Sequence, residues 1–209
     1  MRRKTLLVLS VLIAALQLST SITQSSPLAA PGQSAFGVNS HIATRYPDES
    51  TLDIPAQLLA QAEAGWVRED FQMSWLEPQR DSFDWRFHDI AIEQLAARGI
   101  NIIGVVGGPT PEWAAAGNPG GTFYPPDPQL FAQFASTVVA RYKDRIHHWE
   151  IWNEPDNQSY WRPGPDPVAY TRLLKAASAA IRAADPGAKI LVAGIVSPEP
   201  AVSCLSTIT

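Results

Sequence analysis

Cysteine and charge are both scarce in this chain of 209 residues. Its one cysteine, Cys204, excludes an intrachain disulfide and a cysteine-rich zinc site. Charged residues make up 17 % of the chain, the formal net charge is −4, and no stretch is strongly basic. A protein that binds a phosphate backbone needs such a stretch, so we expect no nucleic-acid partner. The apolar share of 45 % is that of a folded protein rather than a disordered one.

Long apolar runs are missing as well. The mostly apolar run of residues 6–18 is too short to cross a bilayer as a helix, which takes ~20 residues. It follows Arg2, Arg3 and Lys4, and this layout is typical of a secretory signal peptide, with cleavage expected between Ser19 and Ala30. An uncleaved membrane anchor is the alternative. We expect residues 1–30 to be a signal peptide and linker and residues 31–209 to be the folded domain. The mature protein is then secreted or extracytoplasmic, with no stable membrane insertion.

Several motifs of common enzyme sites are also absent. The chain has no G-x-S-x-G elbow, and the glycine-rich residues 104–109 lack the G-x-G-x-x-G order of a phosphate cradle. His147 and His148 are adjacent, so on a strand they point to opposite faces and cannot form a simple metal pair. We therefore expect neither a cofactor nor a metal.

The remaining sequence alternates between strand-like and helix-like segments. Strands are expected at residues 35–42, from 66 onward, and at 100–106, 146–152 and 189–195; the second of these opens with residues 66–68. Helices are expected at 53–64, at 85–98, from 127 and from 166. In helix 53–64, the residues Ile54, Leu58, Leu59 and Ala62 have the spacing of one buried face. This alternation predicts a parallel sheet, either an open doubly wound sheet or a (β/α)8 barrel. The strands recur about every 38 residues, so a barrel of eight units takes roughly 300 residues, and this chain would be a barrel truncated after about its fifth strand.

The most informative motif, W-E-I-W-N-E-P, covers residues 149–155 at the end of the fourth expected strand. In a parallel α/β fold the functional site lies at that end, and Pro155 cannot continue the sheet ladder. A carboxylate there, Glu154, can donate a proton if apolar neighbours such as Trp152 and Trp161 raise its pKa. Asn153 offers a donor and acceptors for substrate hydroxyls. A glutamate that only caps a loop is the alternative.

With this motif, the sequence resembles the glycoside hydrolases of clan A, which are retaining (β/α)8-barrel enzymes such as family 5 cellulases and family 39 β-xylosidases. Residues 37–41 (GVNSH) are similar to their first-strand segment, residues 65–71 and 75–78 to their second, and residues 109–113 to the loop after their third. The resemblance implies a carbohydrate substrate with β-linkages. It assigns proton transfer to Glu154, beside Asn153, and gives Arg68 the role of holding the nucleophile ionised and oriented, with a salt bridge inside the barrel as the alternative for Arg68. We expect Asn39 and His41 to contact sugar hydroxyls, with a purely structural role as the alternative. We expect Trp113, Trp152 and Trp161 to stack on the flat, apolar faces of sugar rings, with packing in the core or in loops as the alternative.

One part of the family pattern is not found. The retaining mechanism needs a second carboxylate ~5–5.5 Å from the first, and the resemblance places it after the seventh strand, so the nucleophile is expected to be missing from this chain. Glu150 lies four strand residues before Glu154, roughly 13 Å away at ~3.3 Å per residue, and is expected to pair with Arg68. Glu69, Asp70 and Glu112 have no motif support as replacements.

The sequence thus predicts a secreted retaining glycosidase of which the N-terminal part is present. The alternative is an inactive or carbohydrate-binding barrel remnant from a truncated gene. A binding protein complete at five strands of an open sheet would explain the length but not the motif at residues 149–155.

Overall fold

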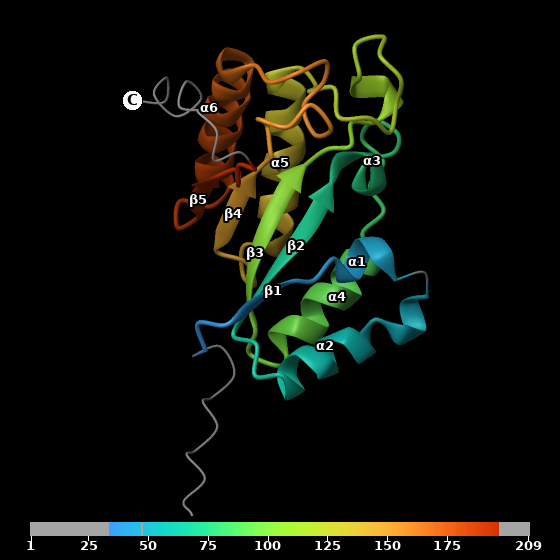
Figure 1. Cartoon of the computed structure of the whole chain (residues 1–209). Coiled ribbons are helices and arrows are strands. Elements are labelled where there is room, and N and C mark those ends of the chain that lie inside the picture. The colour runs from blue at the N-terminus through green and yellow to red at the C-terminus, as the bar shows by residue number, and fades with distance from the viewer. Residues whose placement is uncertain (1–33, 47, 197–209) are drawn as a thin grey trace, which may run out of the picture.

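The computed structural model describes residues 34–46 and 48–196. The predicted signal peptide, its cleavage site and Cys204 lie outside these residues. The described part contains one parallel sheet whose strands follow each other in sequence order (Figure 1). Its strands are β1 (Gly37–Asn39), β2 (Trp66–Gln72), β3 (Asn101–Gly107), β4 (His148–Ile151) and β5 (Lys189–Val192).

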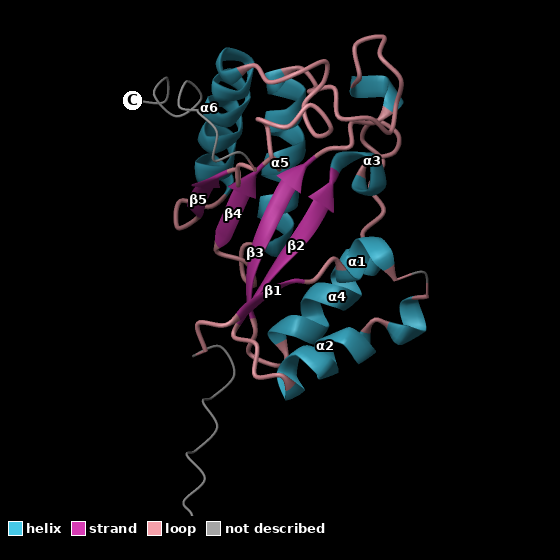
Figure 2. Ribbon diagram, in the orientation of Figure 1, coloured by secondary structure: helices cyan, strands magenta, loops and turns pink. Residues whose placement is uncertain are grey.

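Helices connect the strands and cover the sheet (Figure 2). Helices α2 and α4 pack together near β1, and α5 and α6 pack together beside β4 and β5. None of the described helices is long and apolar enough to span a membrane. The helices are α1 (Ile42–Arg45), α2 (Asp53–Gln61), α3 (Met73–Leu76), α4 (Arg86–Ala96), α5 (Pro128–Tyr142) and α6 (Pro167–Ala184), with 3-10 turns η1 (Glu49–Thr51) and η2 (Glu112–Ala114).

The strand order decides between the two predicted architectures. A doubly wound sheet reverses its strand order at a switch point, whereas a barrel adds each strand beside the previous one. The described sheet runs β1-β2-β3-β4-β5 without a reversal. The predicted parallel sheet is therefore confirmed, and of the two predicted architectures its strand order is that of a barrel.

Two helix starts follow directly from local sequence. Asp127 accepts hydrogen bonds from the backbone N–H groups of Gln129 and Leu130, and Asp166 accepts one from that of Ala169. Each aspartate is followed by a proline at the first helical position, which needs no hydrogen-bond acceptor for its nitrogen. These caps fix where α5 and α6 begin, as predicted.

The prediction for residues 35–42 was wrong in its extent. Strand β1 ends at Asn39, His41 adopts a left-handed backbone with φ 50°, and α1 begins at Ile42. The left-handed turn ends the strand because it points the following residues away from the ladder. The predicted buried face of α2 was also wrong, since Ile54 and Leu58 are 49 % and 57 % exposed.

The face that α2 buries contains Pro55 and Ala56. Their small side chains let α2 lie close to α4. The predicted face followed the larger apolar residues of the helix, so the spacing of these two small residues was not recognised.

Aromatic packing behind the sheet holds the strands to the helices. The Phe71 ring lies 4.9 Å from the His88 ring and 5.3 Å from those of Tyr142 and Trp149, measured between centroids. A side chain at Gly104 would place its Cβ 2.5 Å from the Trp149 ring, so only glycine leaves room for that indole. This packing fixes β2 and β4, the two strands that carry the charged residues of the inward face.

Candidate active site

A cleft of about 770 Å³ lies along the inward face of the sheet and the carboxyl ends of its strands. In parallel α/β folds this is the end where loops gather and sites form. Six of the residues singled out from the sequence line the cleft: Asn39, His41, Arg68, Trp152, Asn153 and Glu154. They come from β1, β2 and the loop after β4, so the fold brings together segments more than a hundred residues apart.

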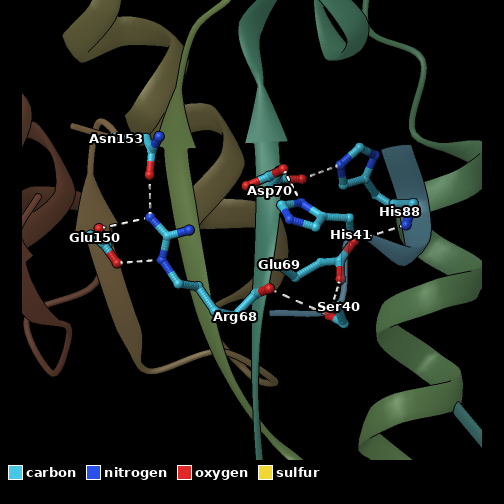
Figure 3. A network of polar contacts seen from close by, with 9 residues as sticks. Ser40, His41, Arg68, Glu69, Asp70, His88, Glu150 and Asn153 are labelled. Carbon is cyan, nitrogen blue, oxygen red and sulfur yellow. Dashed lines mark hydrogen bonds and ion pairs between the residues drawn. The ribbon is translucent and has the colours of Figure 1, made fainter. Parts of the chain in front are cut away.

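Arg68 is the centre of the hydrogen bonds on the inward face (Figure 3). Its Nε donates to Oε2 of Glu150 at 2.8 Å, and its Nη2 donates to Oε1 of Glu150 and Oδ1 of Asn153, both at 2.9 Å. The predicted pairing of Glu150 with Arg68 is confirmed. The hydrogen bond to Glu150 raises the pKa of Arg68, and the nearby carboxylates of Asp70 and Glu154 act in the same direction.

Glu150 is thereby removed from the set of free carboxylates. Its Oε1 also accepts the backbone N–H of Gly194 at 2.8 Å, and its side chain is 8 % exposed. A carboxylate held by a bidentate arginine and a backbone amide is a stable acceptor that orients its partners. The hydrogen bond from Arg68 then fixes the side chain of Asn153, the residue next to Glu154.

Glu154 itself stands on an unusual stretch of backbone. Trp152 has φ 73° and Glu154 has φ 46°, both in the left-handed region that residues with side chains rarely adopt. Each such residue costs of order 1–3 kcal/mol and persists where the surrounding structure supports it. The backbone N–H of Glu154 donates to the Gly194 carbonyl at 3.0 Å, and Oε2 of Glu154 accepts from Nδ2 of Asn157 at 3.1 Å. Glu154 is half-buried at the cleft.

A second set of contacts joins β2 to the segment after β1 (Figure 3). His41 Nδ1 lies 2.5 Å from Oδ2 of Asp70. Glu69 accepts hydrogen bonds from the Ser40 hydroxyl and, at 2.8 Å, from the backbone N–H of Ala43. Glu69 is completely buried, and this burial raises its pKa. Glu69 and Asp70, two of the alternatives for the missing nucleophile, thus both contact the segment between β1 and α1.

Two of the three predicted sugar-stacking tryptophans do not lie in the cleft. Trp161 is 1 % exposed and packs edge-on against Trp152 and Tyr170 in the core. Trp113 is held elsewhere by a hydrogen bond from its Nε1 to the Glu77 carbonyl at 3.0 Å. Trp152 lines the cleft although it is 1 % exposed.

Two aromatic residues that the sequence did not single out lie at the cleft. Phe123 and Tyr160 line the cleft and meet edge-on with their ring centroids 5.0 Å apart. Both come from loops, where no periodic pattern marks a residue as inward. Among the described residues, no three His, Cys, Asp or Glu side chains are grouped to hold a metal ion.

Comparison with known proteins finds similarity to glycoside hydrolases. A family model described as β-galactosidase, glycoside hydrolase family 42, matches residues 44–122. A family 39 glycoside hydrolase from Bacteroides cellulosilyticus WH2 has 21 % identity and a TM-score of 0.59, with 78 % of this chain and 31 % of that chain covered. The chain resembles the clan A glycoside hydrolases.

Two further solved structures show the same likeness. A family 39 β-xylosidase from Caulobacter crescentus has 20 % identity and a TM-score of 0.61, with 83 % of this chain and 42 % of that chain covered. A family 5 enzyme from Streptomyces cattleya, solved with Manβ1-4GlcNAc, has 18 % identity and a TM-score of 0.61, covering 75 % and 44 %. The described sheet is therefore five strands of a (β/α)8 barrel, and the chain spans less than half the length of these clan A relatives.

Proposed function

We propose that this chain is the acid/base-bearing part of a secreted clan A glycosidase that cleaves β-linked glycans with retention. The observation that carries the proposal is the position of Glu154. It lies in the cleft directly after β4, next to an asparagine that Arg68 holds in place. A half-buried carboxylate at the cleft beside a fixed amide can protonate a glycosidic oxygen while the amide binds a neighbouring hydroxyl.

The proposed first step transfers a proton from Glu154 to the leaving oxygen while a second carboxylate attacks the anomeric carbon. Water then releases the sugar, and Glu154 takes back a proton from that water. Oε2 of Glu154 is engaged by Asn157, and no described residue bonds Oε1, so Oε1 is the atom we assign to proton transfer.

We place the attacking carboxylate outside residues 34–46 and 48–196. Glu150 is held by Arg68 and Gly194, and Asp70 is held by His41. A nucleophile must approach the anomeric carbon, and carboxylates with these partners are not free to do so. The solved relatives are more than twice as long as the matched part, which leaves room in a complete barrel for such a residue.

Carbohydrate binding without hydrolysis is the second candidate. It is favoured by the same engagement of Glu150 and Asp70, which leaves Glu154 as the one cleft carboxylate of the described part without a cation or ring partner. Under this alternative the cleft retains sugar contacts through Asn153 and His41 but performs no bond cleavage.

The decisive experiment uses a complete barrel, made by joining this chain to the remaining β/α units of a clan A enzyme with their attacking carboxylate. It compares this barrel with its Glu154→Gln variant on two kinds of β-glycoside. A 4-nitrophenyl glycoside needs little leaving-group protonation, whereas a disaccharide needs it fully. Loss of general acid catalysis should reduce turnover of disaccharides by ~10²–10⁴-fold and that of the aryl glycoside much less. Azide should rescue the variant and give a glycosyl azide of retained configuration.

Glu63→Gln is the matched control, because Glu63 also has a left-handed backbone, with φ 56°, but is exposed at the end of α2. It should leave turnover unchanged. Equal losses on both substrates in Glu154→Gln would contradict the acid role. Saturable disaccharide binding by the complete barrel with no turnover of either substrate would support the binding alternative.

The proposal of secretion rests on the residues before the described part. We expect a host culture to release the protein with an N-terminus between Ser19 and Ala30. Mass spectrometry of the released protein measures that terminus, and intact Met1 in a membrane fraction would indicate the uncleaved anchor instead.

A further inference from the structure

We propose that Asp70 and Glu69, neighbouring carboxylates of β2, are positioning residues that fix the backbone and the ring tautomer of His41, so that its Nε2 is presented to the cleft as a hydrogen-bond acceptor. The role of that acceptor toward a sugar hydroxyl rests on the function proposed above. The positioning itself does not, because it follows from contacts within the chain.

The first step concerns where the two carboxylates point. Successive side chains of a strand lie on opposite faces, so Arg68 and Asp70 share the inward face and Glu69 lies on the other. The structure agrees: Arg68 and Asp70 line the cleft, whereas Glu69 is completely buried and does not. The segment after β1 continues beside the middle of β2, and the two carboxylates contact it from opposite faces of that strand.

The second step concerns the backbone of that segment. The backbone of His41 is left-handed, a conformation that glycine adopts easily but that residues with a side chain adopt only rarely. Glu69 accepts hydrogen bonds from the Ser40 hydroxyl on one side of His41 and from the Ala43 N–H on the other. The Ser40 N–H also donates to the Arg68 carbonyl at 3.1 Å. These contacts hold the backbone on both sides of His41, at Ser40 and at Ala43, which supports a conformation that costs free energy when unsupported.

The third step concerns the ring. A carboxylate accepts hydrogen bonds, so the neutral His41 ring carries its proton on Nδ1, which lies 2.5 Å from Asp70. Nε2 is then an acceptor. Within the part of the chain that the structure describes, Nε2 has no protein partner, although the side chain is 22 % exposed and lines the cleft.

His88 provides a contrast within the same network. Its Nε2 lies 2.8 Å from the carbonyl oxygen of Asp70, and a carbonyl can only accept, so the neutral His88 ring carries its proton on Nε2. The residue Asp70 therefore holds two histidine rings, one through its side chain and one through its backbone, in opposite tautomers.

The experiment records long-range proton–nitrogen correlations of the four histidine rings in the 15N-labelled full chain near pH 7.5. Loss of one ring signal in His41→Gln and of another in His88→Gln assigns the two rings. We expect His41 in the Nδ1–H form and His88 in the Nε2–H form. In Asp70→Ala, His41 should shift to the Nε2–H form that free histidine prefers, while Asp70→Asn, which keeps an acceptor oxygen, should retain Nδ1–H.

Two more variants complete the test. Glu69→Gln replaces one accepting oxygen by a donor, and we expect hydrogen exchange at the Ala43 amide to speed up by roughly tenfold. Asp144→Ala removes an exposed carboxylate after α5 and should change neither the tautomers nor that exchange. An Nε2–H form of His41 in the unmodified chain, an unchanged tautomer in Asp70→Ala, or unchanged exchange in Glu69→Gln would overturn the proposal.

Addition of xylobiose or cellobiose separates this inference from the proposed function. If a disaccharide binds beside His41, the Nε2 signal should move in the unmodified chain and in Asp144→Ala. If the tautomers behave as expected but neither disaccharide moves the signal, the positioning roles of Asp70 and Glu69 stand and the sugar assignment fails.

Discussion

Buried His88 should make the stability of the fold sensitive to mild acid. Its side chain lies behind β2, 3 % exposed, with its ring against Phe71 and its Nε2–H directed to the Asp70 carbonyl. Burial lowers the pKa of His88 from 6.5 to about 4. Between pH 6.5 and about 4 the unfolded chain therefore binds a proton at this position, whereas the folded chain does not.

The size of the effect follows from that difference in pKa. Because the folded-state pKa is the lower one, the contribution is complete above pH 6.5 and is lost as the pH falls toward 4. A shift of one pKa unit corresponds to about 1.4 kcal/mol, so the free energy of unfolding should fall by about 3 kcal/mol over this range. Small domains have roughly 5–15 kcal/mol in total, so the loss is large enough to measure.

The assay is urea unfolding at a series of pH values between 4 and 7.5, for the chain and for His88→Gln. Glutamine can still donate to the Asp70 carbonyl but has no titrating group. Glu69 acts in the opposite direction, since its raised pKa favours the folded state as the pH falls, but it is present in both proteins. The difference between the two curves therefore isolates His88. Parallel curves would refute the reasoning.

Two further predictions concern packing and ion pairing. Arg68→Lys should lower the free energy of unfolding by about 1–3 kcal/mol, because lysine cannot bind both oxygens of Glu150 and also reach Asn153. The control is Arg86→Lys, whose side chain is 66 % exposed and which should leave the free energy of unfolding unchanged in the same urea titration. An equal effect of the two substitutions would contradict a special role for Arg68. Gly104→Ala should lower the free energy of unfolding by about 1–3 kcal/mol, because its Cβ clashes with Trp149. Gly164→Ala should have no effect, because a Cβ there meets no atom within 4 Å. Calorimetric melting of both variants checks this prediction, and equal melting temperatures would contradict it.

The sequence allowed prediction of those features that depend on local rules. The caps at Asp127 and Asp166 act on residues two or three positions away, so they can be read directly. The pair of Arg68 and Glu150 could also be inferred, because strand parity and a parallel sheet place both on the inward face.

The features that sequence analysis missed depend on contacts between distant segments. The left-handed turn at His41 is supported by Asp70 and Glu69, which lie 29 and 28 residues away in the chain. Whether a tryptophan stacks on a ligand or fills the core depends on the loop around it. Trp161 lies in the core because its ring packs against those of Trp152 and Tyr170. Neither outcome leaves a periodic trace in the sequence.

The left-handed backbone at Glu154 has a consequence for any attempt to evolve or engineer this protein. Glycine adopts φ 46° without strain, so Glu154→Gly should relieve a local cost while deleting the proposed proton donor. Selection for thermal tolerance alone would therefore favour loss of the proposed proton donor. A library screened only for soluble, heat-resistant protein should enrich glycine or asparagine at this position, and a screen that also demands turnover should retain glutamate.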